Sequence, residues 1–535
     1  MRYSRFVPVA VLGVVVSALI GGLFGSNVAA RQDEVTQQYR VFTSALAAVD
    51  REYVDAVPSD RLVYSAIDGM LKTLDPHSSF FDPKSYSQMR ERQEGKYYGL
   101  GIQIQVIDGD ITVMSIFEGS PAYRKGLRRG DVIARIAGND AKGWTSEQAV
   151  AKLKGPKGTT VAISLKRRGY DGLIDLDVER DEVNIVTVRG AFMIDKDTGY
   201  IKLGDFSETS DDEVGAALKK LSDAGMKRLV FDLRDNPGGP LDQAIKIANR
   251  FLPRGDMIVY TRGRIPNSDQ DYRATEDSQY THLPMVLLVN RNSASASEIV
   301  TGSLQDHDRA LVVGETTFGK ALVQSVYRIS GNAGLALTTG RYYTPSGRMI
   351  QRPWDGTFDE YLTYSLRDQN PQREHSASQL KHTDAGRDVF GGGGIDPDKF
   401  MVGSAEGFNP TRFSRGLVAR GAFANFADQF TAEGDTRLSA ANKNKKTIAK
   451  GFTLTDAMFS DFRTSLTTQK VVIDEAAFTK DETFIRAMIR YDIDVALFGT
   501  SEARKNLISK DPQAQFALSQ FPDAIRLTTL SARKQ

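Results

Sequence analysis

The chain contains no cysteine, which excludes disulfide bonds, thiolate metal sites and a cysteine nucleophile but leaves the cellular compartment open. Histidine is scarce as well. No two of the five histidines lie four residues apart, so a metal site built from them on one helix face is not expected: His77, His282, His307, His375 and His382. A metal site built from histidines is therefore not predicted.

An excess of charge of one sign is also lacking. The 69 basic residues nearly cancel the 67 acidic ones, the net charge is +2, and no arginine-rich patch occurs, so no nucleic-acid partner is predicted. With 41% hydrophobic and 25% charged residues the composition is that of a globular protein. A chain of 535 residues is too long for one ordinary domain, and about two to four are expected.

Only the N-terminus carries a long hydrophobic run. Arg2 and Arg5 precede 25 uncharged residues, Phe6 to Ala30. Roughly 20 apolar residues span a bilayer core, so a membrane anchor is one interpretation. The small residues Val28 and Ala30 suit signal peptidase, so a cleaved signal peptide is the other. Either one places the rest of the chain outside the cytoplasm, because basic residues come first.

The next two segments differ in pattern. Residues 31–95 have a helical pattern that includes a proline-bounded turn, "LDPHSSFFDP", in which His77 is expected to be structural. Residues 96–182 are predicted to be rich in β-strands, because "GLGIQIQVIDGDITVMSI" alternates apolar and polar residues around the turn "DGD". A short helix follows, with Thr145 as its N-cap and Gly155 as its stop.

Residues 183–398 alternate strand and helix patterns, which predicts an α/β domain with a mainly parallel sheet. The apolar run "PMVLLVN" is a buried strand, and the serine-rich "SASAS" after it opens a helix. Another helix starts at Pro240, just after "FDLRDNPGG". Residues 351–394 are polar and are expected to form a surface excursion. Residues 399–535 are predicted to be helical and contain no chemical motif.

The serine-rich helix start could be catalytic. Unpaired N–H groups at a helix N-terminus stabilise an oxyanion, but a serine also needs a base. His307 lies about a dozen residues along the same helix, roughly 18 Å away at 1.5 Å per residue. His282 precedes the strand and should lie at its opposite end. Lys320 follows the next strand and belongs at the same sheet edge, and a buried lysine can accept a proton.

Residues 96–182 resemble a PDZ domain, on the basis of Gly99-Leu100-Gly101-Ile102 and of "GSPA...GL..GD" between Gly119 and Asp131. The resemblance implies that amides of the Gly99–Ile102 loop bind the terminal carboxylate of a peptide, which adds as a strand to a free sheet edge. The alternative is a glycine-rich hairpin that binds nothing.

The chain from about residue 35 to residue 398 resembles the carboxy-terminal processing peptidases. The motifs are "VNRNSASASEIVTG", "VVGETTFGKALVQ" and "FDLRDNPGG", together with "LDPHSSFFDP" and "GGGGIDPD". The resemblance implies a multidomain α/β protein with a peptidase core of the ClpP/crotonase-like type. The expected segments are a signal peptide or anchor (1–30), a helical region (31–95), a PDZ domain (96–182), the peptidase core (183–398) and a helical extension (399–535).

The resemblance also implies a Ser–Lys dyad, a mechanism that requires no metal or cofactor. Ser295 would be the nucleophile and Lys320 the base, with Gln324 orienting the lysine. Ser293 and Ser297 are the rival nucleophiles, and without the family the three serines would be nearly tied.

The oxyanion hole would combine the amide of Ala296 with that of Gly238 or Gly239, which the sequence does not separate. Ala321 departs from the family pattern, which has glycine after the lysine. If that position needed a positive φ, the alanine would cost about 1 kcal/mol.

The expected function is that of a serine endopeptidase in the bacterial cell envelope that recognises protein C-termini. The expected partners are proteins or peptides with free, apolar C-termini, the membrane through the N-terminus, and an activating or adaptor protein; a homo-oligomer is left open. Whether the PDZ domain covers the site or activates it also stays open. The alternatives are a membrane-attached scaffold that binds tails without cutting them and a general quality-control degrader with loose tail preference.

Overall fold

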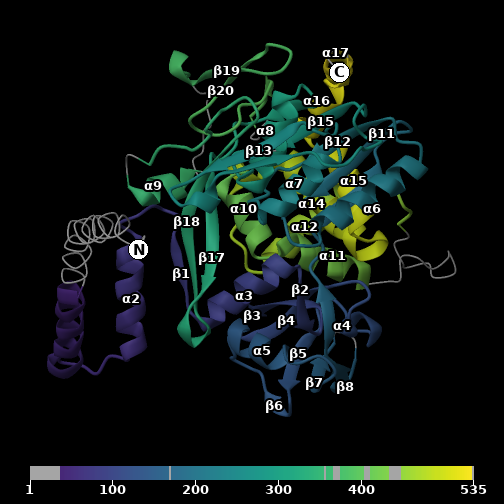
Figure 1. Cartoon of the computed structure of the whole chain (residues 1–535). Helices are drawn as coiled ribbons and strands as arrows, with labels where there is room; N and C mark the ends of the chain where they lie inside the picture. The colour runs from purple at the N-terminus through teal and green to yellow at the C-terminus, as the bar shows by residue number, and fades with distance from the viewer. Residues whose placement is uncertain are drawn as a thin grey trace, which may run out of the picture. The chain divides into compact units, whose positions relative to one another are not determined.

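The computed structural model describes residues 36–167, 170–354, 357–364, 374–402, 410–432 and 448–532. The predicted signal peptide or anchor, residues 1–30, lies outside these ranges. Within them, no helix combines the length and the hydropathy of a membrane span. The chain divides into two compact units, Met1–Asp82 with Arg328–Ala336, and Pro83–Tyr327 with Leu337–Gln535 (Figure 1).

The first unit is mainly helical, as predicted. Residues 36–52 form a helix, followed by α2 (Ser59–Leu71). The predicted turn contains a short strand, β1 (Ser79–Phe81), which pairs antiparallel with residues 334–336 at the start of β18 (Gly334–Tyr343). A strand of three residues is too short to show a period of two, and so the sequence pattern did not predict it.

The second unit begins with α3 (Pro83–Glu94) and the PDZ-like domain. Its elements are β2 (Lys96–Gly99), β3 (Ile102–Ile107), β4 (Asp110–Ile116), α4 (Pro121–Arg124), β5 (Val132–Ile136), β6 (Asn139–Asp140), α5 (Ser146–Leu153), β7 (Thr160–Lys166), β8 (Ile174–Glu179) and β9 (Asp181–Asn184). The antiparallel sheet runs β3-β4-β5-β7-β8, so β3 is an edge strand. The predicted hairpin is confirmed. Its turn uses Asp108 and Gly109, which both have positive φ. Thr145 caps α5, also as predicted.

The α/β core contains a six-stranded sheet in the order β10 (Val188–Met193), β11 (Thr198–Leu203), β12 (Arg228–Asp232), β15 (Met285–Val289), β16 (Leu311–Gly314) and β21 (Lys399–Phe400). Every neighbouring pair is parallel except β10 and β11, which confirms the predicted mainly parallel sheet. The crossovers carry α6 (Ser210–Asp223), α7 (Leu241–Asn249) and α8 (Ala296–Asp306).

A second sheet contains β13 (Met257–Arg262), β14 (Gln270–Arg273), β17 (Leu322–Arg328) and β18. The strands predicted after residue 320 therefore exist, but they are not part of the parallel sheet. Only residues 329–333 separate β17 from β18, and a parallel crossover needs a dozen residues or more. The polar stretch 351–394 includes α9 (Phe358–Leu362), β19 (Leu380–His382) and β20 (Asp388–Phe390).

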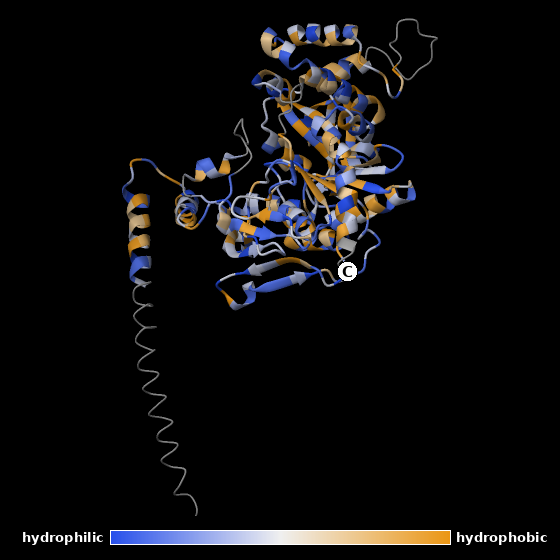
Figure 2. Cartoon of the chain, turned by 90° about the horizontal axis from the view of Figure 1, so that it is seen from above, coloured by the Kyte–Doolittle hydropathy of each residue, from blue (hydrophilic) through white to orange (hydrophobic). Residues whose placement is uncertain are grey.

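The parallel sheet is covered on both faces. In β15, Leu287 packs in the apolar cluster of α7 and α8, whereas its neighbour Leu288 packs in a cluster with Phe521 and Leu527. The latter two belong to α17 (Phe521–Ala532), which lies with α15 (Thr500–Ile508) and α16 (Pro512–Ser519) on that second face. The helices in Figure 2 carry both hydrophobic and hydrophilic colour, as expected of helices that cover a sheet with one side only. Because a parallel sheet needs cover on both faces, the C-terminal extension completes the core.

The remaining C-terminal helices form a cluster of their own. They are α10 (Arg412–Ala419), α11 (Ala422–Ala432), α12 (Asp456–Thr468), α13 (Glu475–Lys480) and α14 (Glu482–Phe498). The predicted helical character of this region is confirmed. Arg129 of the PDZ-like domain forms ion pairs with Asp428 of α11 and Asp492 of α14, over 3.4 and 3.3 Å.

Candidate active site

The three serines that precede α8 differ in what their hydroxyl groups contact. Ser293 and Ser297 are fully buried. Ser293 Oγ donates to the carbonyl of Leu233 at 2.9 Å, and Ser297 Oγ donates to the carbonyl of Asn236 at 3.0 Å. Ser295 is partly exposed and lies at the N-cap position of α8. The two outer hydroxyls therefore hold the fold together, whereas the middle serine is the partly exposed one.

Ser295 also has an unusual backbone conformation, with φ 56° and ψ −113°. A non-glycine residue in such a region stores about 1–3 kcal/mol of strain and persists only where its surroundings hold it. The carbonyl of Ser295 accepts the amides of Glu298 and Ile299, at 2.8 and 3.0 Å, and so begins the helix. The chain thus turns sharply between β15 and α8 at this serine.

Glu298 connects this turn to the loop that carries Lys320. Its carboxylate is fully buried and accepts four hydrogen bonds, from the amides of Ser295, Gly319 and Lys320 and from the Thr317 hydroxyl, over 2.5–2.9 Å. Burial raises the pKa of Glu298, and these hydrogen bonds oppose the rise. Glu298 was not predicted from the sequence. The available signal was the S-x-x-E spacing from Ser295, which is typical of a capping box.

Lys320 lies after β16, in the loop where the sequence predicted it. Its Nζ donates to Oε1 of Gln324 at 2.9 Å, so the predicted base and the residue predicted to orient it are in contact. The buried hydroxyl of Tyr342 lies 2.5 Å from the carbonyl of Lys320 and 3.2 Å from that of Ser295. Burial raises the pKa of Tyr342 well above its usual value, so this hydroxyl stays protonated. Both predicted dyad residues are therefore held by the same two side chains, Glu298 and Tyr342.

Ala321 fits its position without backbone strain. It is not among the residues with positive φ, and its amide donates to Oε1 of Gln351 at 2.9 Å. The penalty that an alanine would suffer at positive φ therefore does not arise.

The two glycines of "NPGG" have different surroundings. A Cβ on Gly238 would lie 2.8 Å from both the amide nitrogen of Ala296 and Cβ of Ser295, so glycine allows the close approach at this point. The amide of Gly238 donates to Oδ1 of Asn236 at 2.9 Å. A Cβ on Gly239 would instead collide with Phe206. Among the hydrogen bonds described, none uses the amide of Gly239 or of Ala296.

The loop predicted to bind a carboxylate lies at the edge of the PDZ-like sheet, between β2 and β3. Gly101 has φ 78°, and a Cβ there would lie 2.2 Å from Cβ of Ser120, so both the backbone conformation and the space require glycine. The carbonyl of Leu100 accepts the amide of Ala122, and the carbonyl of Gly101 accepts that of Phe117, both at 2.9 Å. Gly99, Leu100, Gly101 and Ile102 thus form a fixed loop beside the edge strand β3.

The contacts of His307 are those of a structural residue. It follows α8, with Nδ1 2.7 Å from Asp384 and Nε2 2.7 Å from the carbonyl of Met257. Burial lowers the pKa of His307, but these two hydrogen bonds outweigh burial and raise it. The described part of the chain contains no group of three or more histidine, aspartate or glutamate side chains placed to hold a metal ion.

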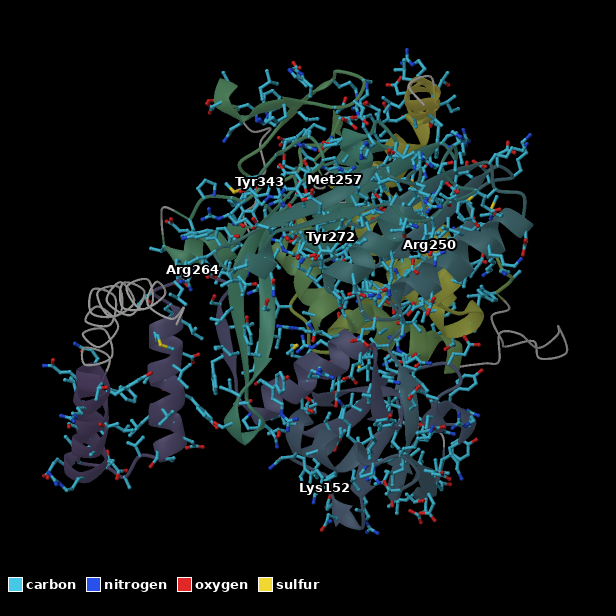
Figure 3. The ribbon with its side chains drawn as sticks, viewed as in Figure 1. Lys152, Arg250, Met257, Arg264, Tyr272 and Tyr343 are labelled. Atoms are coloured by element: carbon cyan, nitrogen blue, oxygen red, sulfur yellow. The ribbon has the colours of Figure 1, made fainter. Side chains whose placement is uncertain are left out.

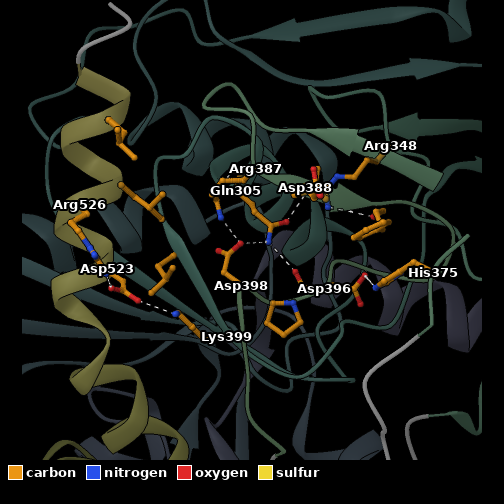
Figure 4. Close-up of a pocket in the computed structure, with 16 residues that line it drawn as sticks. Gln305, Arg348, His375, Arg387, Asp388, Asp396, Asp398, Lys399, Asp523 and Arg526 are labelled. Atoms are coloured by element: carbon orange, nitrogen blue, oxygen red, sulfur yellow. Dashed lines mark hydrogen bonds and ion pairs between the residues drawn. The ribbon is translucent and has the colours of Figure 1, made fainter. Parts of the chain in front are cut away.

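A cavity of about 610 Å³ lies among β20, β21 and α17 (Figure 4). Two ion pairs lie within its lining: Arg387 contacts Asp398 at 2.5 Å and Lys399 contacts Asp523 at 2.9 Å. Asp398 belongs to the "GGGGIDPD" motif and also accepts the amide of Val312 at 2.8 Å. This part of the motif therefore anchors β16. Neither Ser295 nor Lys320 lines the cavity.

Comparisons with known proteins agree with this architecture. Residues 197–357 match the model of peptidase family S41, and residues 88–166 match that of the PDZ domain. A carboxy-terminal-processing protease of Bartonella bacilliformis is 37% identical over 345 residues, which cover 64% of this chain and 79% of that protein.

Two further relatives have similar coverage. The carboxy-terminal processing protease CtpA of Bacillus subtilis is 32% identical, over 66% of this chain and 75% of its own length. The carboxyl-terminal-processing protease of Synechocystis is 36% identical, over 54% of this chain and 68% of its own length.

A PDZ domain joined to an S41 core defines a serine-type peptidase. The chain belongs to the carboxy-terminal processing proteases.

Proposed function

We propose that this peptidase acts outside the cytoplasm, recognises the C-termini of proteins through the Gly99–Ile102 loop, and cleaves with Ser295 as nucleophile and Lys320 as base. The observation that carries the proposal is the contrast among the three serines. The hydroxyls of Ser293 and Ser297 donate hydrogen bonds to backbone carbonyls, whereas Ser295 is partly exposed on a strained turn.

In the proposed reaction, the neutral amine of Lys320 takes the proton of Ser295 as Oγ attacks the substrate carbonyl carbon. Gln324 fixes the amine through its contact at 2.9 Å. The lysine then gives the proton to the departing amine, and the acyl-enzyme forms. Lys320 next deprotonates a water, which attacks the ester and restores the serine.

The oxyanion would be held by two backbone amides. That of Ala296 lies at the N-terminus of α8, where unpaired N–H groups and the helix dipole favour negative charge. Since Asn236 already binds the amide of Gly238, Gly239 is the better second donor. Gly238, which has no side chain, would allow the "NPGG" segment to lie close to the turn at Ser295.

The proposed location outside the cytoplasm rests on the first 30 residues. Arg2 and Arg5 precede the uncharged run Phe6 to Ala30. Mass spectrometry of the N-terminus of the native protein distinguishes a cleaved signal peptide, with a new start after Ala30, from a retained anchor. A protein recovered intact from the cytoplasmic fraction would contradict both.

The test of C-terminal recognition is a pair of denatured reporters that differ only in their last group. One ends in an apolar tail with a free carboxylate, and in the other the same tail is amidated. We expect faster cleavage of the free-acid reporter. Equal rates would contradict tail recognition, and tail binding without any cleavage would favour a scaffold.

A further inference from the structure

An ion pair lies beside the Gly99–Ile102 loop. Glu91 of α3 contacts Lys154, which directly follows α5, and the two side chains are 30% and 33% exposed. The stem of Lys154 lies against Gly99, because its Cγ would lie 3.6 Å from a Cβ placed on that glycine. Its Nζ is 4.6 Å from the centre of the Tyr97 ring. The pair therefore adjoins the amides that would receive a carboxylate.

Tyr97 covers the same loop from β2. Its Cε2 would lie 3.0 Å from a Cβ on Gly99, so the ring lies against that glycine. Burial raises the pKa of Tyr97 to about 12, the negative charge of Glu91 adds to the rise, and a hydrogen bond with the backbone of Gly101 opposes it. The hydroxyl is therefore protonated at neutral pH and already engages the backbone of the loop.

We infer that Lys154 is a specificity-determining residue for the terminal carboxylate of a substrate, and that Glu91 occupies Lys154 until that carboxylate arrives. The inference rests on the proposed recognition of C-termini and names the groups that perform it. A bound carboxylate would take the ammonium of Lys154 as its counter-ion, and Glu91 would be released to solvent.

This exchange would select chain ends. A free C-terminus brings a negative charge that can replace Glu91 on Lys154, whereas an internal segment or an amidated end brings none. The apparent affinity for a tail with a free carboxylate would be reduced by the fraction of molecules in which Lys154 is held by Glu91. Removing the charge of Glu91 should therefore tighten the binding of carboxylates alone.

The experiment measures binding by fluorescence anisotropy. The protein is the full chain with Ser295→Ala, so that the probe stays intact. The probes are a short fluorescein-labelled peptide that ends in Leu-Ala-Ala with a free carboxylate, and the same peptide amidated. The variants are Glu91→Gln, Lys154→Met and the two combined. Lys154→Arg keeps the positive charge, so it tests whether a loss of affinity in Lys154→Met comes from the missing charge or from a disturbed structure.

Matched controls carry the same changes of charge at exposed sites of the same domain. They are Glu179→Gln on β8 and Lys152→Met on α5, where Lys152 is labelled in Figure 3. These controls account for long-range attraction between the domain and the charged probe.

We expect Glu91→Gln to bind the free-acid peptide about threefold more tightly, and Lys154→Met to bind it about tenfold more weakly. The affinity for the amidated peptide should not change in either variant. In the combined variant, Glu91→Gln should give no gain, because the residue that it frees is missing. Lys154→Arg should retain most of the preference for the free acid.

Three outcomes would overturn the inference. If the parent protein does not prefer the free acid, the proposed C-terminal recognition fails and the inference fails with it. If the parent prefers the free acid but Glu91→Gln and Lys154→Met behave like their controls, only the inference fails. If Lys154→Met and Lys154→Arg weaken the binding of both peptides equally, Lys154 supports the loop and does not read the carboxylate.

Discussion

The backbone amides of Ser295 and Lys320 donate to the same atom, Oε2 of Glu298, over 2.8 and 2.9 Å. The other oxygen of Glu298 accepts the amide of Gly319 and the hydroxyl of Thr317. One buried carboxylate therefore sets the start of α8 against the loop after β16. Four donors converge on it, and only a group with two acceptor oxygens satisfies all of them.

Replacing this carboxylate should impair catalysis more than binding. In Glu298→Gln an NH₂ group would face two donors, the turn at Ser295 would shift, and a misplacement of about 1 Å can cost about 100-fold in rate. We expect kcat to fall by about that factor, with the affinity for a tail peptide unchanged. Initial rates and anisotropy measure the two quantities.

Glu315→Gln is the matched control for Glu298→Gln. Glu315 is buried in the same loop, but it pairs with Arg291 at 3.0 Å and contacts neither dyad residue. The Glu315→Gln protein should retain most of the activity of the wild type. A Glu298→Gln protein with the kcat of the wild type would contradict the positioning role.

The cover that α17 gives the parallel sheet predicts a large loss of stability in Phe521→Ala. Phe521 is fully buried against the face of the sheet that carries Val286 and Leu288. Truncating a buried phenylalanine costs about 3–5 kcal/mol in free energy of unfolding. Urea denaturation measures this loss. Leu530→Ala, on the exposed side of the same helix, should cost less than about 1 kcal/mol. Equal losses for the two variants would argue against the packing described.

The contact between the PDZ-like domain and the C-terminal helices predicts a pH dependence. Burial raises the pKa of Asp428 to about 6, Arg129 opposes the rise and Asp492 adds to it. The folded state therefore holds this proton more tightly than the unfolded chain, in which the ordinary pKa is 3.8. Asp428 therefore lowers the stability of the folded state as the pH rises from about 4 to about 6. Above that range the loss of stability is constant.

Asp428→Asn should remove the penalty. We expect its Tm to exceed that of the wild type by about 2 °C near pH 7.5, with little difference near pH 4, where both side chains are neutral. Thermal unfolding over this pH range measures the difference. A Tm difference that does not change with pH would contradict the assignment.

Local patterns predicted most of the elements. The hairpin β3–β4 follows from alternation around a turn that favours positive φ, and the helix after Pro240 follows from its start signal. The pairing of β18 with β13 in a second sheet did not follow, nor did the cover provided by α15 to α17. Both depend on contacts between segments far apart in the sequence, and periodicity carries no information about such partners.

The same limit applies to the site. From the sequence, Ser293, Ser295 and Ser297 are equivalent small polar residues at a helix start. They differ only because the carbonyls of Leu233 and Asn236, some 60 residues earlier, accept hydrogen bonds from the outer two. The dyad was predicted through a family resemblance. Glu298 was missed because no rule linked it to the loop of Lys320.

The most direct test of the proposed Ser295–Lys320 dyad is a cleavage assay with a denatured reporter that has a free, apolar C-terminal tail. The wild type, Ser295→Ala and Lys320→Ala are compared in this assay. Ser293→Ala and Ser297→Ala serve as controls. Each control loses a structural hydrogen bond worth about 1 kcal/mol but should keep its activity within about tenfold. We expect the Ser295→Ala and Lys320→Ala proteins to be folded, to bind the tail and not to cut it. Cleavage by Ser295→Ala at a rate like that of the controls would show that another residue is the nucleophile.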